Sequence, residues 1–235
     1  MQRCMQHVRQ ARPAYCSAVR LLLIRHAETP ANVSGALSTR PPGPGITDLG
    51  QEQAEALAEA LADTPLDGLY VSTLRRTALT AAPLAARLGL DARVIDGVEE
   101  IEAGDYEDLT DRQSFQDYLA PIKRWAEGDL DACIPGAYDG RHFLERFDGA
   151  VAEVARRHGD DSTVAVVSHA GAIRVWLGGR AANLDAAFTA SHNLANTGVI
   201  VLVGSPSDGW IIETWMGEPV GPVDVAARDP LGEAL

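Results

Sequence analysis

The sequence has 235 residues, of which 46% are hydrophobic and 23% charged, as is typical of a globular protein with a sizeable core. Its net charge of −13 argues against binding to nucleic acids or anionic membrane surfaces, although a local group of arginines can still hold a small phosphorylated compound. No apolar run reaches the roughly 20 residues of a membrane helix. Three cysteines without zinc-site spacing favour a reducing cytoplasm over an extracellular protein in which Cys4 pairs with Cys16.

Residues 1–18 are basic and lack an apolar central region, so we expect a disordered extension or an overlong start rather than a secretory signal. After them, apolar runs that suit buried strands alternate with stretches of helical periodicity. In chain order the expected elements are a strand at 20–24, helices from about 30 and from 48, a strand at 68–72, a helix at 73–88, a strand at 92–96, helices near 114–127 and at 139–158, a strand at 164–168, a helix from about 169, and strands at 198–203 and 210–215.

This alternation predicts an α/β fold, a three-layer sandwich with a mostly parallel central sheet and helices on both faces. The last two strands are separated by the short turn SPSDG, and we expect them to form an antiparallel edge. No linker divides the chain, so 19–216 is expected to be a single domain with a partly helical insertion at about 103–140. Residues 217–235 contain glycine and proline without a clear period, which predicts a loose tail.

Polar side chains follow each of four expected strands, at the end where open α/β sheets bind ligands. They suit phosphoryl transfer, because a neutral imidazole can attack phosphorus, forked guanidinium groups match phosphate oxygens, and a carboxylic acid can protonate a leaving oxygen. This chemistry requires no metal or other cofactor, and no P-loop or EF-hand pattern is present. In chain order these residues are Arg25, His26, Ser72, Arg75, Arg76, Glu99, Glu100, Ser168 and His169.

Four segments of the chain resemble, in the same order, the motifs of the histidine phosphatase superfamily, also called phosphoglycerate mutase-like. RHAET at 25–29 is similar to its Arg-His-Gly-Glu signature and STLRRT at 72–77 to its Ser-x-Leu-x-Arg element. VEEIEAG at 98–104 is similar to its acid/base segment, and SHAGAIR at 168–174 to its second-histidine element. The resemblance extends over about residues 20–215 and implies a phosphoglycerate mutase-like fold. The chain departs from the family pattern at Ala27 and Asp108, where glycine is usual.

The resemblance implies a role for each matched residue. His26 would be the nucleophile and Glu100 the acid and base. Glu99 is the alternative to Glu100, and because neighbouring strand residues point to opposite faces, only one of the two should face the site. Arg40, in the loop rich in proline and glycine at 40–47, could reach the substrate. The residues expected to hold the phosphoryl oxygens are Arg25, Asn32, Arg76 and His169.

The expected function is hydrolysis of a small phosphorylated metabolite through a phosphohistidine intermediate. One alternative is phosphoglycerate mutase-type transfer, but the stretch between Glu100 and His169 is shorter than in the mutases. A second alternative is a phospho-ligand binding protein without catalysis, although every matched catalytic position is occupied by the expected residue type. The sequence does not identify the substrate, and it leaves open whether the protein is a homodimer.

Overall fold

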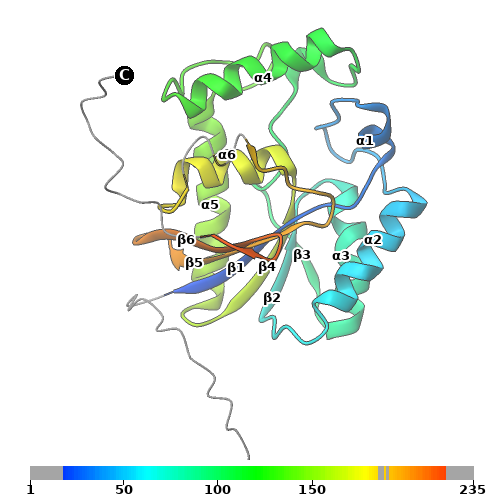
Figure 1. The fold of residues 1–235 in the computed structure, drawn as a ribbon, viewed down its shortest axis with the longest axis vertical. Helices are drawn as coiled ribbons and strands as arrows, with labels where there is room; N and C mark the ends of the chain where they lie inside the picture. Colours follow the sequence, from blue (N-terminus) through cyan, green and yellow to red (C-terminus); the bar gives the residue numbers. More distant parts are fainter. Residues whose placement is uncertain (1–17, 185–187, 189–190, 221–235) are drawn as a thin grey trace, which may run out of the picture.

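The computed structural model describes residues 18–184, 188 and 191–220. Seven strands within this part are β1 (Val19–Arg25), β2 (Gly68–Val71), β3 (Ala92–Val94), β4 (Thr163–Ser168), β5 (Val199–Ser205), β6 (Gly209–Trp215) and β7 (Glu218–Pro219). They form one sheet in the order β3-β2-β4-β1-β5-β6-β7 (Figure 1). β3, β2, β4 and β1 run parallel, and β5, β6 and β7 extend the sheet by antiparallel pairing, as the sequence predicts for the edge.

Helices lie on both faces of this sheet. The elements that the structure describes besides the strands are α1 (Pro30–Ser34), α2 (Asp48–Ala60), α3 (Arg75–Leu88), α4 (Arg112–Ala126), α5 (Gly140–His158) and α6 (Ala170–Arg180), with a short 3-10 turn, η1, at Gly104–Tyr106. Figure 1 shows α2 and α3 on one side of the sheet and α5 and α6 on the other. The expected three-layer α/β sandwich is therefore confirmed.

Alternation along the buried strands explains the two faces. Leu22 and Ile24 of β1 pack in one core with α2 and α3, whereas Leu21 and Leu23 pack in the other with α5 and α6. The larger core contains most of the aromatic side chains, including Trp176 of α6 stacked on a phenylalanine of α5 at 5.1 Å between ring centroids. A strand that is buried on both faces must be apolar at every position, which is why the run RLLLI predicts it well.

The register of the parallel strands brings their carboxyl ends level. Arg25 at the end of β1 pairs with Ser168 at the end of β4, and Val71 of β2 pairs with Val167 of β4. The residues that follow these three strands therefore start from neighbouring positions along one edge of the sheet. This register brings together segments that are up to about 140 residues apart in the sequence.

Some element boundaries differ from those expected. β3 ends at Val94 rather than at 96, so the segment that carries the two adjacent glutamates is a loop.

α2 is capped by Thr47, whose hydroxyl accepts a hydrogen bond from the backbone N–H of Gly50 at 3.0 Å. Pro83 lies inside α3 without ending it. The helix ends at Leu88 and is capped by Gly89, which has a left-handed φ of 65°.

The expectation of a loose tail from 217 was wrong for its first residues. Trp215 pairs with Glu218, and the two residues between them, Met216 and Gly217, have positive φ values of 49° and 88°. Such a two-residue turn reverses the chain into an antiparallel strand, β7. The expectations for 1–17 and for 221–235 fall outside the described residues. None of the helices described here has both the length and the apolar character that crossing a bilayer requires.

Candidate active site

Two histidines lie together at the carboxyl edge of the parallel strands. His26 follows β1 and His169 follows β4, and the backbone N–H of His26 donates to the carbonyl of Ser168 at 3.0 Å. Both rings are buried, with 4% and 0% exposure, and their centroids are 5.2 Å apart. The sequence prediction that the ends of these strands converge is therefore correct for the pair of histidines.

The ring of His26 is held with one nitrogen available for attack. Its Nδ1 lies 2.7 Å from the carbonyl oxygen of Ala27, which can only accept, so Nδ1 carries the proton and Nε2 keeps its lone pair. Burial lowers the pKa of His26 to about 3, assisted by the charges of Arg76 and Arg25 and opposed by the hydrogen bond to Ala27. The imidazole is thus neutral at physiological pH, the form that acts as a nucleophile.

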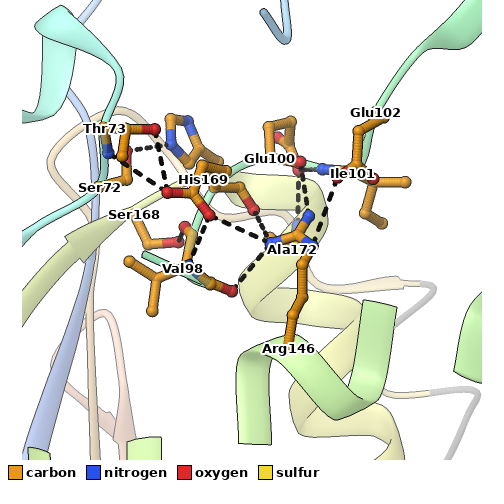
Figure 2. Close-up of polar contacts among 12 residues, drawn as sticks. Ser72, Thr73, Val98, Glu100, Ile101, Glu102, Arg146, Ser168, His169 and Ala172 are labelled. Atoms are coloured by element: carbon orange, nitrogen blue, oxygen red, sulfur yellow. Dashed lines mark hydrogen bonds and ion pairs between the residues drawn. The ribbon is translucent and has the colours of Figure 1, made fainter. Parts of the chain in front are cut away.

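His169 is also neutral, but both of its ring nitrogens are engaged within the protein. Arg76 approaches Nδ1 with Nε at 3.2 Å and Nη2 at 3.0 Å, and since arginine only donates, Nδ1 must accept. Nε2 therefore carries the proton and donates to Ser72 Oγ at 2.8 Å (Figure 2). Burial, with the charge of Arg76 and the proximity of His26, lowers the pKa of His169 well below its usual range.

Two arginines supply fixed positive charge beside the histidines. Arg76, at the start of α3, is 3% exposed, and burial lowers its pKa to about 10 despite the opposing effect of Glu100, so it stays charged at neutral pH. Arg25 donates from Nη1 to the carbonyl of Leu194 at 2.7 Å, while its buried Nε has no hydrogen-bond partner among the described residues. A guanidinium group that is shielded from solvent and keeps a free donor is suited to bind an anion such as a phosphoryl group.

The structure separates the two adjacent glutamates. Glu100 lies at the N-terminus of α6, where its carboxylate accepts from the backbone N–H of Ala172 at 2.7 Å and of Gly171 at 3.2 Å (Figure 2). Glu99 instead accepts from the hydroxyl of Thr73 at 3.0 Å and from the backbone N–H of Gly97 at 2.7 Å. Burial lowers the pKa of both site arginines and the charge of Glu100 opposes this effect, so its carboxylate lies on the same side of the site as Arg25 and Arg76.

Asn32 lies at the same edge, on α1. Its Oδ1 accepts from the backbone N–H of Thr29 at 3.2 Å and from Asn196 Nδ2 at 3.3 Å, so its amide NH2 is the group it can offer to an oxygen of a ligand. Asn196 also donates to the backbone carbonyl of His26 at 2.9 Å and joins the segment before β5 to the site. Glu28 accepts from the hydroxyl of Thr47, the cap of α2, at 2.8 Å.

Comparison with known proteins agrees with this geometry. Residues 21–216 match the sequence profile of the histidine phosphatase superfamily, branch 1. The chain belongs to the histidine phosphatase superfamily. The PE-PGRS family protein PE_PGRS11 of Mycobacterium tuberculosis is 36% identical over 217 residues, which are 86% of this chain but 37% of that protein. Phosphoserine phosphatase 1 of Hydrogenobacter thermophilus is 32% identical over 151 residues, covering 64% of this chain and 71% of the relative.

Solved structures show the same histidine phosphatase fold. A mycobacterial glucosyl-3-phosphoglycerate phosphatase in its native form has a TM-score of 0.69 and 27% identity to this chain. The match covers 84% of this chain and 98% of that structure. The phosphoglycerate mutase-like fold that the motifs imply is therefore confirmed.

The departures of this histidine phosphatase from the family pattern have simple structural explanations. The methyl group of Ala27 is fully buried, and the backbone N–H of this residue donates to the hydroxyl of Thr80 at 2.9 Å. Asp108 has a left-handed φ of 64°, a conformation that glycine adopts freely and that aspartate tolerates better than most residues. Its backbone N–H donates to the carbonyl of Leu37 at 2.7 Å, which links the insertion to the loop after α1.

Arg40 lies outside the buried part of the site. Its side chain is exposed and donates from Nη2 to the carbonyl of Gly104 at 3.2 Å. Glu107 fixes this loop by accepting from the backbone N–H groups of Thr39 and Arg40 at 2.7 and 3.0 Å. Burial lowers the pKa of Arg76, and the charges of Glu100 and Glu107 oppose this effect, so the loop and the insertion border the site. Direct contact of Arg40 with a substrate stays a prediction.

Sequence reasoning missed two arginines near the site. Arg174 of α6 is half-buried, and burial lowers its pKa despite the opposing charge of Glu100. Burial likewise lowers the pKa of Arg25, against the charge of Glu100, and the charge of Arg174 adds to this lowering. Arg174 is the last residue of the SHAGAIR segment, which could have drawn attention to it. Arg146 of α5 is nearly buried behind Glu100. The sequence feature that could have identified Arg146 is its position between Phe143 and Phe147, which places a charged residue on the apolar face of a helix.

Proposed function

We propose that this histidine phosphatase hydrolyses phosphomonoesters of small metabolites through a phosphohistidine formed on Nε2 of His26. One observation carries the proposal: a buried, neutral imidazole whose Nδ1 is fixed by a backbone carbonyl lies beside the charged Arg25 and Arg76. The lone pair of Nε2 is the nucleophile, and the guanidinium groups stabilise the charge that develops on the phosphoryl oxygens.

In the first step, Nε2 of His26 forms a bond to phosphorus as the bond from phosphorus to the ester oxygen breaks. Arg25, Arg76 and the amide of Asn32 hold the phosphoryl oxygens. Glu100 in its protonated form gives its proton to the leaving oxygen, so the alcohol departs neutral. The phosphoryl group remains on His26 and Glu100 is left as a carboxylate.

In the second step, the Glu100 carboxylate accepts a proton from water as the water oxygen bonds to phosphorus. The bond between phosphorus and Nε2 breaks, inorganic phosphate leaves, and both His26 and Glu100 return to their starting states. One residue thus acts as acid and then as base, which requires the same carboxyl group to face both the leaving and the attacking oxygen.

His169 supports this centre in two ways. Through Nδ1 it holds the guanidinium of Arg76, and through Nε2 it carries a proton that Ser72 now accepts. We place that proton beside the phosphoryl group during turnover, where a ligand oxygen would compete with Ser72 for it. Removal of His169 should therefore lower both phosphate affinity and turnover.

A small metabolite is the substrate class that the relatives favour, because they include proteins named as phosphoserine and glucosyl-3-phosphoglycerate phosphatases. The site of the described chain also borders loops at 37–40 and 103–108, which can contact the rest of a substrate. We further propose that catalysis needs no metal and that the protein acts in the cytoplasm. Arg40 is the residue we assign to contact with the substrate beyond its phosphoryl group.

The test is phosphate release from a panel of phosphorylated metabolites by the wild type and by His26→Asn. We expect release with at least one metabolite, little transfer of the phosphoryl group to an added acceptor, and loss of at least about a thousandfold in kcat for the variant. Transfer in preference to release would favour a mutase. Binding of phosphorylated compounds without any turnover would favour a protein that only binds them.

A further inference from the structure

Arg146 joins α5 to the loop that carries Glu100. From α5 its guanidinium donates to three backbone carbonyls, those of Gly97 and Glu99 from Nη1 at 2.8 and 3.1 Å and that of Glu100 from Nη2 at 2.8 Å (Figure 2). Its side chain is 14% exposed. These three hydrogen bonds fix the path of residues 97–100 against α5.

Further contacts keep the guanidinium of Arg146 in place. Glu99 Oε2 lies 3.6 Å from Nη1, Glu102 Oε1 lies 3.5 Å from Nε, and the ring of Phe143 lies 5.1 Å from the guanidinium carbon. These groups neutralise its charge and cover one face, so the side chain has little freedom. A planar fork can reach three carbonyls at once, whereas a single ammonium group cannot match this geometry.

The loop itself lies directly on α5. Gly97 has a φ of 101°, and a Cβ atom at this position would lie 2.5 Å from the backbone carbonyl oxygen of Arg146 and 3.0 Å from Cβ of Ala150. Ser168 Oγ donates to the carbonyl of Val98 at 2.7 Å on the other side of the loop. The backbone of Glu100 is thus fixed by Arg146, and its carboxylate by the N-terminus of α6.

We propose that Arg146 is a positioning residue for Glu100, holding its backbone so that the carboxyl group faces the leaving oxygen. This inference rests on the proposed function, because it assigns Arg146 to the proton transfer and not to phosphate binding. Arg146 touches neither His26 nor the phosphate-binding arginines in any described contact. Its loss should therefore affect the step that needs the acid and leave phosphate affinity nearly unchanged.

Leaving groups of different basicity separate these two roles. An alkyl phosphate releases a strongly basic alkoxide and needs the proton, whereas 2,4-dinitrophenyl phosphate releases a weakly basic phenolate and does not. The ratio kcat/KM covers only the steps up to release of the first product, so hydrolysis of phosphohistidine does not enter it. We expect Arg146→Gln to lower kcat/KM about 10- to 100-fold for the alkyl ester and less than about threefold for the dinitrophenyl ester.

The experiment compares Arg146→Gln, Arg146→Lys, Glu100→Gln and the double variant Arg146→Gln/Glu100→Gln on both esters. Arg141→Gln is the matched control, because Arg141 lies on the same helix, is exposed, and pairs with Asp131 at 2.6 Å. If Arg146 acts through Glu100, its replacement has no further effect once Glu100 is gone. Arg146→Lys keeps the charge and should recover part of the rate, and inhibition by inorganic phosphate should change less than about threefold.

Equal losses on the two esters, or an undiminished effect of Arg146→Gln in the Glu100→Gln background, would overturn the inference. If Arg146→Gln does not fold, the losses that Arg146→Lys shows on the two esters are judged by the same criteria. Failure of the proposed function has a different signature, because Glu100→Gln alone would then show no preference between the esters or the wild type would show no turnover. The two ideas can therefore fail separately.

Discussion

The lowered pKa of His26 makes the free energy of unfolding depend on pH. Replacing this side chain should remove its contribution to that pH dependence. The folded protein keeps the imidazole neutral down to about pH 3, whereas an unfolded histidine titrates near 6.5. Between these values the unfolded chain binds the extra proton. The contribution of the neutral imidazole is therefore complete above about pH 6.5 and is lost progressively as the pH falls toward 3.

The size of the effect follows from the two pKa values. From pH 7 to pH 4.5 the unfolded histidine becomes protonated while folded His26 does not, which is about two pKa units or about 2–3 kcal/mol. Urea unfolding of the wild type and of His26→Asn across this range gives the difference in free energy of unfolding at each pH. Groups that titrate in both proteins cancel, so this difference should shift against the wild type by about 2–3 kcal/mol at the lower pH.

A control and a refuting result complete this test. His142→Asn removes an exposed imidazole from α5 and controls for loss of a surface histidine. A difference between the wild type and His26→Asn that stays constant within about 0.5 kcal/mol would refute the reasoning. It would mean that His26 binds a proton in the folded protein as readily as in the unfolded one, and a protonated imidazole has no lone pair for attack.

Three further substitutions test neighbouring parts of the site. A Cβ atom at position 171 would lie 2.7 Å from Glu100 Oε1. Gly171→Ala should therefore lower kcat/KM for alkyl phosphates at least about tenfold, while the unfolding midpoint changes little. Full activity of this variant would contradict the placement of Glu100. Arg76→Lys should weaken inhibition by inorganic phosphate and lower kcat/KM at least about a hundredfold. Unchanged inhibition by phosphate together with a smaller loss of kcat/KM would argue against a bidentate contact between Arg76 and the phosphoryl group. Ser72→Ala leaves Nε2 of His169 without its acceptor, which should lower the free energy of unfolding by about 1–3 kcal/mol in urea titrations; an unchanged stability would count against this tautomer.

The central sheet and the pair of histidines could be predicted because strong local signals determine them. Continuous apolar runs identify strands that are buried on both faces, and parallel strands align their carboxyl ends, so His26 and His169 had to lie near each other. The helices were predictable for similar reasons, although their ends shifted by a few residues. α3, for example, begins at Arg75 rather than at 73, because Leu74 has the extended backbone of an N-cap residue.

The choice between Glu99 and Glu100 could not be made firmly from the sequence. The expected argument was strand alternation, but β3 ends at Val94 and both glutamates lie in a loop. Their side chains diverge because different backbone donors hold them, Gly97 for Glu99 and the start of α6 for Glu100. Donors in α6 are about 70 residues away in the sequence, and only the folded chain shows which carboxylate they reach.

Arg146 was missed for a related reason. Its hydrogen-bond partners are main-chain carbonyls in a loop more than 40 residues earlier, and a backbone carbonyl has no sequence signature. The sequence likewise predicted the position of His169 but not the protonation of its two ring nitrogens. A motif can indicate a second histidine, but which nitrogen carries the proton depends on Arg76 and Ser72, which approach it from a different strand and helix.

The most direct test of the account is to find the phosphoryl group on the protein during turnover. Wild-type protein is mixed with excess substrate, quenched in alkali, where phosphohistidine is stable, and digested for mapping of phosphorylated peptides. The account predicts modification at His26, formed before steady-state phosphate release and absent from His26→Asn. Turnover without any covalent phosphoryl group, or with the group on another residue, would contradict it.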